Sequence, residues 1–292
     1  MELERAPYSP IIDRPPFRLP GGARVAVWVI INVEKWDIRN PMPRTVAPPP
    51  GGGSVIPDIP NFSWNDYGLR VGFWRLKAIL DKHGVKGTLS LNAECCNTHP
   101  RLVEACVKSD WEILAHGYVQ RIINAEKDER QVIRDTLATI RKFTGQQPRG
   151  WMGPGLHETW DTPDILAEEG LEYCADWVND DEPYPLKVKS GSLISIPYTL
   201  ELNDIPLHLI QNQGSSGLYD RARAEFETLY EEGRERAKIM TISMHPYVSG
   251  VAHRAGYFDK TLAYLKQQPG VVFMRGVEIL DWYRQFVKQT SA

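Results

Sequence analysis

The chain has 292 residues, enough to bury one large core, and its 42% hydrophobic and 24% charged residues are typical of a globular protein. A net charge of -3 gives no basis for binding nucleic acid, since phosphate contacts need clustered Lys and Arg. No apolar run is long enough to cross a bilayer, and residues 1–20 lack the apolar stretch of a secretory signal. We therefore expect a cytoplasmic protein with no membrane or nucleic-acid partner.

The first strong element is a strand over residues 24–34 (RVAVWVIINVE), a β-branched apolar run that predicts burial on both faces. Residues 37–65 follow as a Pro/Gly-rich loop with PPPGGG at its centre. A long segment at this place in a barrel lies over the catalytic mouth, so we expect a lid that covers the substrate. The alternative is a solvated surface loop or an oligomer contact.

The rest of the chain alternates helices and strands, which predicts a parallel sheet or barrel in a single domain over residues 1–292. The predicted helices are 69–83, 98–107, 126–143, 161–169, 219–232, 257–267 and 277–288. The predicted strands are 87–94, 111–116, 148–152, 173–177, 193–200, 238–244 and 271–274. The strand over 193–200 leads to Glu201, Asn203 and Asp204.

The four cysteines predict reduced, mostly buried thiols. Cys95 and Cys96 are adjacent, Cys106 and Cys174 stand alone, and no CxxC spacing occurs, so a structural zinc site is not expected. A nucleophilic cysteine is the alternative; it needs a nearby base that the sequence does not show.

Polar residues gather at the ends of separate predicted strands, where a barrel places its chemistry. They are Asn32, Glu34, His116, Gln120, Gly153, Pro154, Asp176, Asp180 and His245. Each has a plainer interpretation: a solvent-facing Glu34, core histidines, or aspartates that cap helices and turns. Several tryptophans near strand ends or loops either line a pocket or fill the core: Trp36, Trp64, Trp151, Trp160 and Trp177.

Four motifs together resemble the NodB-type polysaccharide deacetylase superfamily. They are DYGLRVGFWRL (66–76, including Arg70), WEILAHG (111–117), PRGWMGPG (148–155) and ISMHPY (242–247). The branch that the chain resembles holds metal-independent allantoinases, cyclic-imide hydrolases and peptidoglycan-deacetylase-like proteins. The resemblance implies a distorted (β/α) barrel, hydrolysis of a non-peptide carbon–nitrogen bond, and a homotetramer.

Two departures from the family pattern bear on the mechanism. Asn32 stands where metal-dependent members carry an aspartate base, and an amide cannot act as a carboxylate base. Gln120 stands where they carry a second ligand histidine, and zinc prefers His, Cys and carboxylate ligands. Glu34 and His116 remain as ligands, so no cofactor is firmly implied, while one zinc or other divalent metal stays open.

The leading hypothesis is a hydrolase that opens a small cyclic amide, imide or ureide. Glu34 activates or positions water, His245 acts as acid or as orienting partner, and His116, without a metal, donates a hydrogen bond to the oxyanion. The residues expected to bind substrate are Asn32, Gln120, Trp151, Gly153, Pro154, Asp180 and Arg70. The alternatives are a metal-dependent N-deacetylase of an acetylated amino sugar and a non-catalytic binder of carbohydrate or metabolite.

Overall fold

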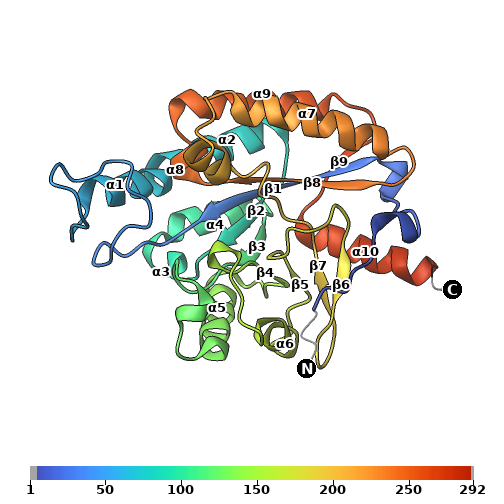
Figure 1. The fold of residues 1–292 in the computed structure, drawn as a ribbon, viewed down its shortest axis with the longest axis horizontal. Helices are drawn as coiled ribbons and strands as arrows, with labels where there is room; N and C mark the ends of the chain where they lie inside the picture. The colour runs from blue at the N-terminus through green and yellow to red at the C-terminus, as the bar shows by residue number, and fades with distance from the viewer. Residues whose placement is uncertain (1–4, 291–292) are drawn as a thin grey trace.

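The computed structural model describes residues 5–290, which contain one nine-stranded sheet curled into a distorted barrel (Figure 1). Its strand order is β6-β7-β5-β4-β3-β2-β1-β8, with β9 also paired to β1. The strands are β1 (Val25–Val33), β2 (Thr88–Leu91), β3 (Glu112–Ala115), β4 (Gly150–Trp151), β5 (Tyr173–Cys174), β6 (Tyr184–Leu186), β7 (Leu193–Ser195), β8 (Lys238–Met244) and β9 (Val271–Phe273). All pairings are parallel except that of β6 with β7, so the expected distorted barrel is confirmed.

Helices flank the sheet, with α7 and α9 beside β8, and α5 and α6 at the opposite side of the molecule (Figure 1). They are α1 (Ile59–Tyr67), α2 (Phe73–His83), α3 (Cys95–Thr98), α4 (Pro100–Lys108), α5 (Glu129–Thr144), α6 (Thr162–Glu168), α7 (Gly217–Glu232), α8 (Pro246–Ser249), α9 (Ala252–Lys266) and α10 (Gly276–Thr290). None of the helices described here is long and apolar enough to span a membrane.

Strand β1 is the central strand of the barrel. Its residues 25–31 pair with β8, residues 25–27 also pair with β9, and residues 30–33 pair with β2. All nine of its residues are buried, as the unbroken apolar run predicted. A strand paired along both edges and covered on both faces has one fixed register, so the residues that follow it are placed reliably.

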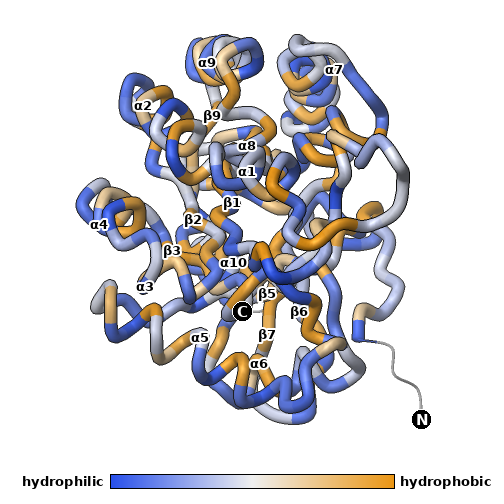
Figure 2. The backbone as a smooth tube through the Cα atoms, turned by 90° about the vertical axis from the view of Figure 1, so that its left-hand side faces the viewer, coloured by the Kyte–Doolittle hydropathy of each residue, from blue (hydrophilic) through white to orange (hydrophobic). Residues whose placement is uncertain are grey.

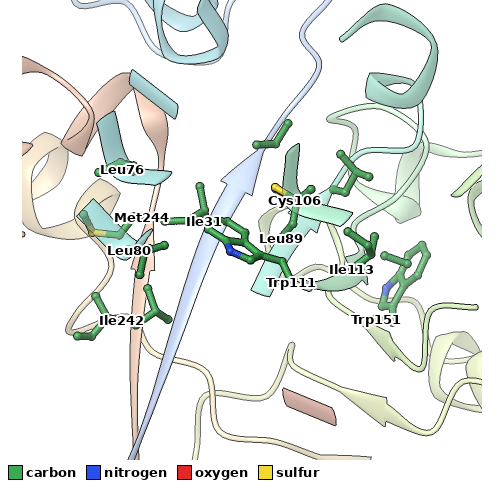
Figure 3. Close-up of a cluster of buried hydrophobic side chains, with 14 of the residues drawn as sticks. Ile31, Leu76, Leu80, Leu89, Cys106, Trp111, Ile113, Trp151, Ile242 and Met244 are labelled. Carbon is green, nitrogen blue, oxygen red and sulfur yellow. The ribbon is translucent and has the colours of Figure 1, made fainter. Parts of the chain in front are cut away.

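The alternation of side chains along β1 separates two layers of core. Odd-numbered residues such as Ile31 pack with Leu76 and Leu80 between the sheet and the outer helices (Figure 3). Even-numbered residues, Trp28 among them, point into the barrel and pack there with Tyr173. Because side chains on a strand alternate between faces, this parity predicts where the residues beyond each strand point.

The expected elements are largely confirmed, with three differences. The loop predicted over 37–65 ends at Asp58, because Asp58 accepts a hydrogen bond from the Asn61 backbone N–H and caps α1. The predicted helix over 69–83 continues α1 through a π turn at Gly68–Gly72. Three short elements, α3, β6 and α8, were not predicted, since they hold only three or four residues.

The carboxyl end of β1 points toward α1 and the loop before it, which project beyond the sheet (Figure 1). Figure 2 looks onto this end and shows α1 and α8 in front of the strands. The elements that contribute chemistry in such a fold therefore converge beneath α1 and α8.

Two glycines allow the π turn and α8 to approach closely. A Cβ built on Gly72 would lie 2.1 Å from the Pro246 carbonyl oxygen, and one on Gly250 would lie 2.5 Å from the Gly72 Cα. Both distances are far inside van der Waals contact, so only glycine fits. This contact fixes α8, which begins directly after His245.

We predict that Gly72→Ala destabilises the protein by about 1–3 kcal/mol, because the new methyl group must push α8 away. Gly256→Ala is the matched control: Gly256 lies in α9 with no atom within 4 Å of its added Cβ. That control should stabilise by ~0.5–1 kcal/mol through helix propensity. Urea unfolding of both variants measures the difference, and equal effects would contradict the close contact.

Candidate active site

Glu34 is the first residue beyond β1 and continues the even-numbered, inward-facing series of that strand. It is only 8% exposed. His116 follows β3 in the same way, since Leu114 faces the barrel interior. His245 follows β8, whose Ile239 also faces inward. The structure thus brings together the three residues that the sequence predicted as catalytic.

The Glu34 carboxylate is surrounded by donors. Its Oε1 accepts from Gln120 Nε2 at 3.0 Å and lies 3.3 Å from His245 Nε2. Its Oε2 accepts from Trp36 Nε1 at 3.2 Å. His116 Nε2 is 4.0 Å from Oε1. A buried carboxylate with this many donors is held in its ionised form.

His245 is joined to a second buried carboxylate, Asp204, on its far side. Asp204 Oδ1 lies 2.7 Å from His245 Nδ1, and Oδ2 accepts from the His245 backbone N–H at 2.7 Å. Asp204 is 0% exposed and precedes the π turn Ile205–Ile210. With a carboxylate at each ring nitrogen, His245 is most stable as an imidazolium that donates to both.

The charges of this group set its protonation state. Burial acts to lower the pKa of His245, but Asp204 and Glu34 outweigh it and raise that pKa to about 9. Burial acts to raise the pKa of Glu34, but the charge and hydrogen bond of His245 hold that pKa below its usual value. At neutral pH, Glu34 is therefore a carboxylate and His245 an imidazolium.

His116 differs from the role expected from the sequence. Its Nδ1 lies 2.6 Å from the Met152 carbonyl oxygen, and a carbonyl can only accept, so Nδ1 carries the proton. Burial lowers the pKa of His116, which keeps the ring neutral. Its Nε2 is then an acceptor, and the expected hydrogen bond from His116 to an oxyanion is not available in this state.

Gln120 contacts the Glu34 carboxylate, and Asn32 lies two residues before Glu34 on the same side of β1. Each of the two amides has one unpaired oxygen. Asn32 Nδ2 donates to Ser243 Oγ at 2.8 Å and to the Met244 carbonyl at 3.3 Å. Gln120 Nε2 donates to Glu34, as described above. Because these bonds fix which end of each amide is N–H, Asn32 Oδ1 and Gln120 Oε1 are acceptors, and neither has a partner within residues 5–290.

The Pro/Gly-rich loop reaches this group through Arg44. The loop is held in place by Asn61 of α1, whose Oδ1 accepts from the backbone N–H groups of Val46 and Ala47 at 2.9 and 3.0 Å. Burial and the charge of Glu34 raise the pKa of the Tyr247 hydroxyl well above its usual value. Arg44 lies close enough to Tyr247 and Glu34 to act on both pKa values in the opposite, lowering direction. This loop end is therefore anchored, and Arg44 adds a positive charge near Glu34.

Tyr247 borders this group of residues on the side of α8. Its ring is 96% buried and packs edge-on against Trp64 of α1 at 4.8 Å between ring centroids. Its hydroxyl has no hydrogen-bond partner in the described residues. A buried hydroxyl without a partner is costly, and it is therefore ready to donate to a bound ligand.

The other predicted substrate-binding residues lie outside this group. Trp151 is 0% exposed in the outer layer of core, because it has the odd, helix-facing parity of Ala115, its partner on β3. Gly153 has the same parity and donates its N–H to Asp176. Pro154 packs over Gly117, the residue that follows His116.

Asp180 and Arg70 are engaged in ion pairs elsewhere. Asp180 accepts from both terminal nitrogens of Arg14, at 3.0 and 2.6 Å. Arg70 is 76% exposed in its side chain and pairs with Asp66 on the same helix. Within residues 5–290, neither side chain forms a hydrogen bond or ion pair with the group around Glu34, so both belong to local ion pairs away from it.

Three contributors were not predicted as site residues: Asp204, Arg44 and Tyr247. Asp204 was noted only as a polar residue after the strand 193–200, and nothing in the linear spacing connects it with His245, 41 residues away. Tyr247 stands in the ISMHPY motif next to His245, which is the signal that could have identified it. Arg44 lies in the loop, where the sequence has no periodicity to place it.

The residues present do not fit the metal that deacetylases of this fold use. Within residues 5–290, Glu34, His116 and His245 do not form a set of ligand atoms that all lie within 4.8 Å of one another. Gln120 points an N–H at Glu34, and His245 is held as a cation beside the same oxygen. Both donors occupy the side of Glu34 Oε1 where a metal ion would bind, so these residues do not fit a zinc site.

The four cysteines are free and buried, as expected. Burial raises the pKa of the Cys96 thiol to about 11, and that of Cys174 well above the usual value. Because thiolate is the nucleophilic form, the alternative of a catalytic cysteine finds no support.

Comparison with known proteins agrees with this geometry. The family model described as polysaccharide deacetylase matches residues 64–174. A Schizosaccharomyces pombe protein assigned as a polysaccharide deacetylase is 31% identical over 227 residues, 70% of each chain. Among solved structures, a Pseudomonas aeruginosa protein assigned as a polysaccharide deacetylase has a TM-score of 0.82 at 25% identity, covering 94% of this chain and 95% of its own. PuuE allantoinase has a TM-score of 0.79 at 25% identity, covering 93% and 94%. On this identity and coverage, the chain belongs to the polysaccharide deacetylase family.

Proposed function

We propose that the protein hydrolyses the carbon–nitrogen bond of a small cyclic ureide or imide, without a catalytic metal. The observation that supports this most is the Glu34–His245–Asp204 group, in which a buried carboxylate base lies 3.3 Å from a buried imidazolium acid. Amide hydrolysis needs both partners at one carbonyl: a base for water and an acid for the leaving nitrogen.

In the first step, Glu34 removes a proton from water as the water oxygen attacks the carbonyl carbon. The carbonyl oxygen becomes an oxyanion, and we assign its stabilisation to hydrogen bonds from the Tyr247 hydroxyl, which has no partner in the described residues, and from Arg44. A well-placed donor of this kind typically contributes ~3 kcal/mol.

In the second step, His245 gives its Nε2 proton to the ring nitrogen, and the carbon–nitrogen bond breaks. The nitrogen leaves as an amine or amide and the carbon becomes a carboxylic acid. Glu34 is then protonated and His245 neutral; since the two atoms are 3.3 Å apart, the proton can return from Glu34 to His245. The group is restored and one water is consumed per bond cut.

The unpaired polar atoms favour one kind of substrate. Gln120 Oε1 and Asn32 Oδ1 each need a hydrogen-bond donor, such as an N–H group, while the Tyr247 hydroxyl needs an acceptor. A ureide, with N–H groups on both sides of a carbonyl, supplies all three. The charges of Glu34, Asp204, His245 and Arg44 also cancel, so a neutral ligand needs no further counter-ion.

A second candidate is an N-deacetylase of an acetylated amino sugar. The relatives assigned as deacetylases favour it, the Helicobacter pylori peptidoglycan deacetylase among them, at 28% identity over 79% of this chain. The same base and acid can cut an acetamide, but its amide has only one N–H, so the second unpaired acceptor would need a sugar hydroxyl as its donor.

We predict that Glu34→Gln lowers kcat by about 10²–10⁴-fold while the fold is retained, because the amide cannot take the proton of water. Glu104→Gln is the matched control, an exposed glutamate on α4. Steady-state kinetics together with circular dichroism measure both. Near-normal turnover in Glu34→Gln would remove Glu34 from the mechanism.

The pH profile tests the acid. Activity should fall as pH rises through about 9, where His245 loses its proton. The raised pKa of this group also stabilises the fold at low pH, and that contribution is lost over the same alkaline range. In Asp204→Asn the alkaline limb should move down by about 1–3 pH units, since one of the two stabilising charges is gone. An unmoved limb would show that Asp204 does not act on His245.

A substrate panel run with and without a chelator separates the candidates. We expect hydantoin-type ureides to give a higher kcat/KM than succinimide, N-acetylglucosamine to be inert, and EDTA to leave turnover unchanged. Turnover of N-acetylglucosamine alone would support the deacetylase instead. Loss of activity with EDTA that zinc restores, while circular dichroism shows the fold unchanged, would contradict the metal-free mechanism.

A further inference from the structure

A second group of ligand-type side chains lies on the other face of the sheet from Glu34. Cys174 ends β5 and belongs to the outer core layer, and Asp176 has the same parity two residues later. Glu158 reaches them from the segment between the turn Pro154–Leu156 and α6. Ala175, between the two β5 ligands, faces the barrel interior. The sheet therefore separates this group from the catalytic residues.

The distances between the three ligand atoms are close to those between the ligands of a bound metal ion. Cys174 Sγ lies 3.2 Å from Glu158 Oε1 and 3.3 Å from Asp176 Oδ2, and all three atoms are within 4.8 Å of one another. In tetrahedral zinc sites, the usual Zn–S and Zn–O bond lengths place neighbouring S and O ligands about 3.6 Å apart. Small movements of these side chains would suffice to enclose the ion.

Two carboxyl groups share this buried place without a cation. Among the hydrogen bonds and ion pairs of residues 5–290, none joins the Glu158 or Asp176 side chain to a Lys, Arg or His. Arg5 lies nearby, but its guanidinium is bound to Asp164 at 2.6 and 2.8 Å. Buried carboxyls need either protons or a positive charge, so the group is suited to a cation.

A buried donor without a partner points to a further ligand here. Trp151 is 0% exposed, and its Nε1–H has no acceptor in the described chain. That nitrogen, Asp176 Oδ2 and the His157 carbonyl oxygen all border Gly153, at 3.5, 3.2 and 2.7 Å from the place where its Cβ would stand. An oxygen bound beside Gly153, such as a metal-bound water, would accept the hydrogen bond from Trp151.

We propose that Glu158, Cys174 and Asp176 bind a zinc ion outside the active site, with a water as fourth ligand held by Trp151. Sulfur and carboxylate ligands together suit Zn²⁺ better than Mg²⁺ or Ca²⁺, which select oxygen alone. On binding, the Cys174 thiol and the carboxyl groups release their protons to solvent as the Zn–S and Zn–O bonds form. A cavity of about 450 Å³ bordered by Glu158 and Trp177 lies beside the site.

The role of this zinc is structural. It joins β5 to the segment that leads into α6, two elements that otherwise meet through a thiol and two carboxyl groups. This site could not be predicted from the sequence, because the ligands come from two segments without CxxC spacing. Its presence would not conflict with a metal-free active site, since the two groups face opposite sides of the sheet.

The test uses the full chain, stripped of metal and then titrated with Zn²⁺ or Co²⁺. We expect one ion per chain by mass spectrometry of metal content, a thiolate-to-cobalt charge-transfer band, and a higher Tm with zinc. Cys174→Ser should lose the band and stoichiometric binding. Asp176→Asn provides a second ligand variant should Cys174→Ser fail to fold.

Two control variants locate the ion. Cys106→Ser removes another buried thiol, in α4, and should keep both the metal and the band. Glu34→Gln changes the active site and should also keep them, which separates this proposal from the proposed function. Absence of stoichiometric binding in the wild type, or an unchanged band in Cys174→Ser, would overturn the zinc site.

Discussion

The contact between the Glu34 carboxylate and the His245 imidazolium, backed by Asp204, is the interaction on which the account of this site depends. Two buried carboxylates and one buried cation are costly separately, and each is stable here because the others are present. The same arrangement keeps a base and an acid charged side by side at neutral pH. In the proposed mechanism, this base and this acid supply both proton transfers of amide hydrolysis.

The fold provides this contact through strand parity and one close packing contact. Glu34, His116 and His245 each stand on the inward-facing side just beyond a strand that is fixed by its neighbours. The approach of Gly72 to Gly250 holds α8, and with it Tyr247, against the catalytic group. These side chains are therefore positioned by rigid elements, and the anchored loop adds the positive charge of Arg44 near Glu34.

The sequence predicted the parallel barrel and the meeting of Glu34, His116 and His245, because apolar strands and polar strand ends follow simple periodicities. It did not predict which neighbours those residues use. Asp204 lies in an irregular segment far along the chain, and the neutral state of His116 depends on a carbonyl of another strand. Trp151 and Gly153 were expected in the pocket, but their odd parity turns them to the helix layer, where the proposed zinc ligands lie. Tertiary contacts of this kind leave no local pattern.

The central claim is that His245 is an imidazolium paired with Glu34 and Asp204. The most direct test is an NMR titration of the His245 ring nitrogens in the wild type and in Glu34→Gln. The account predicts a pKa near 9 in the wild type and a lower value in the variant, since one of the two carboxylates is then neutral. A wild-type His245 that titrates at or below the ordinary value of 6.5 would contradict it.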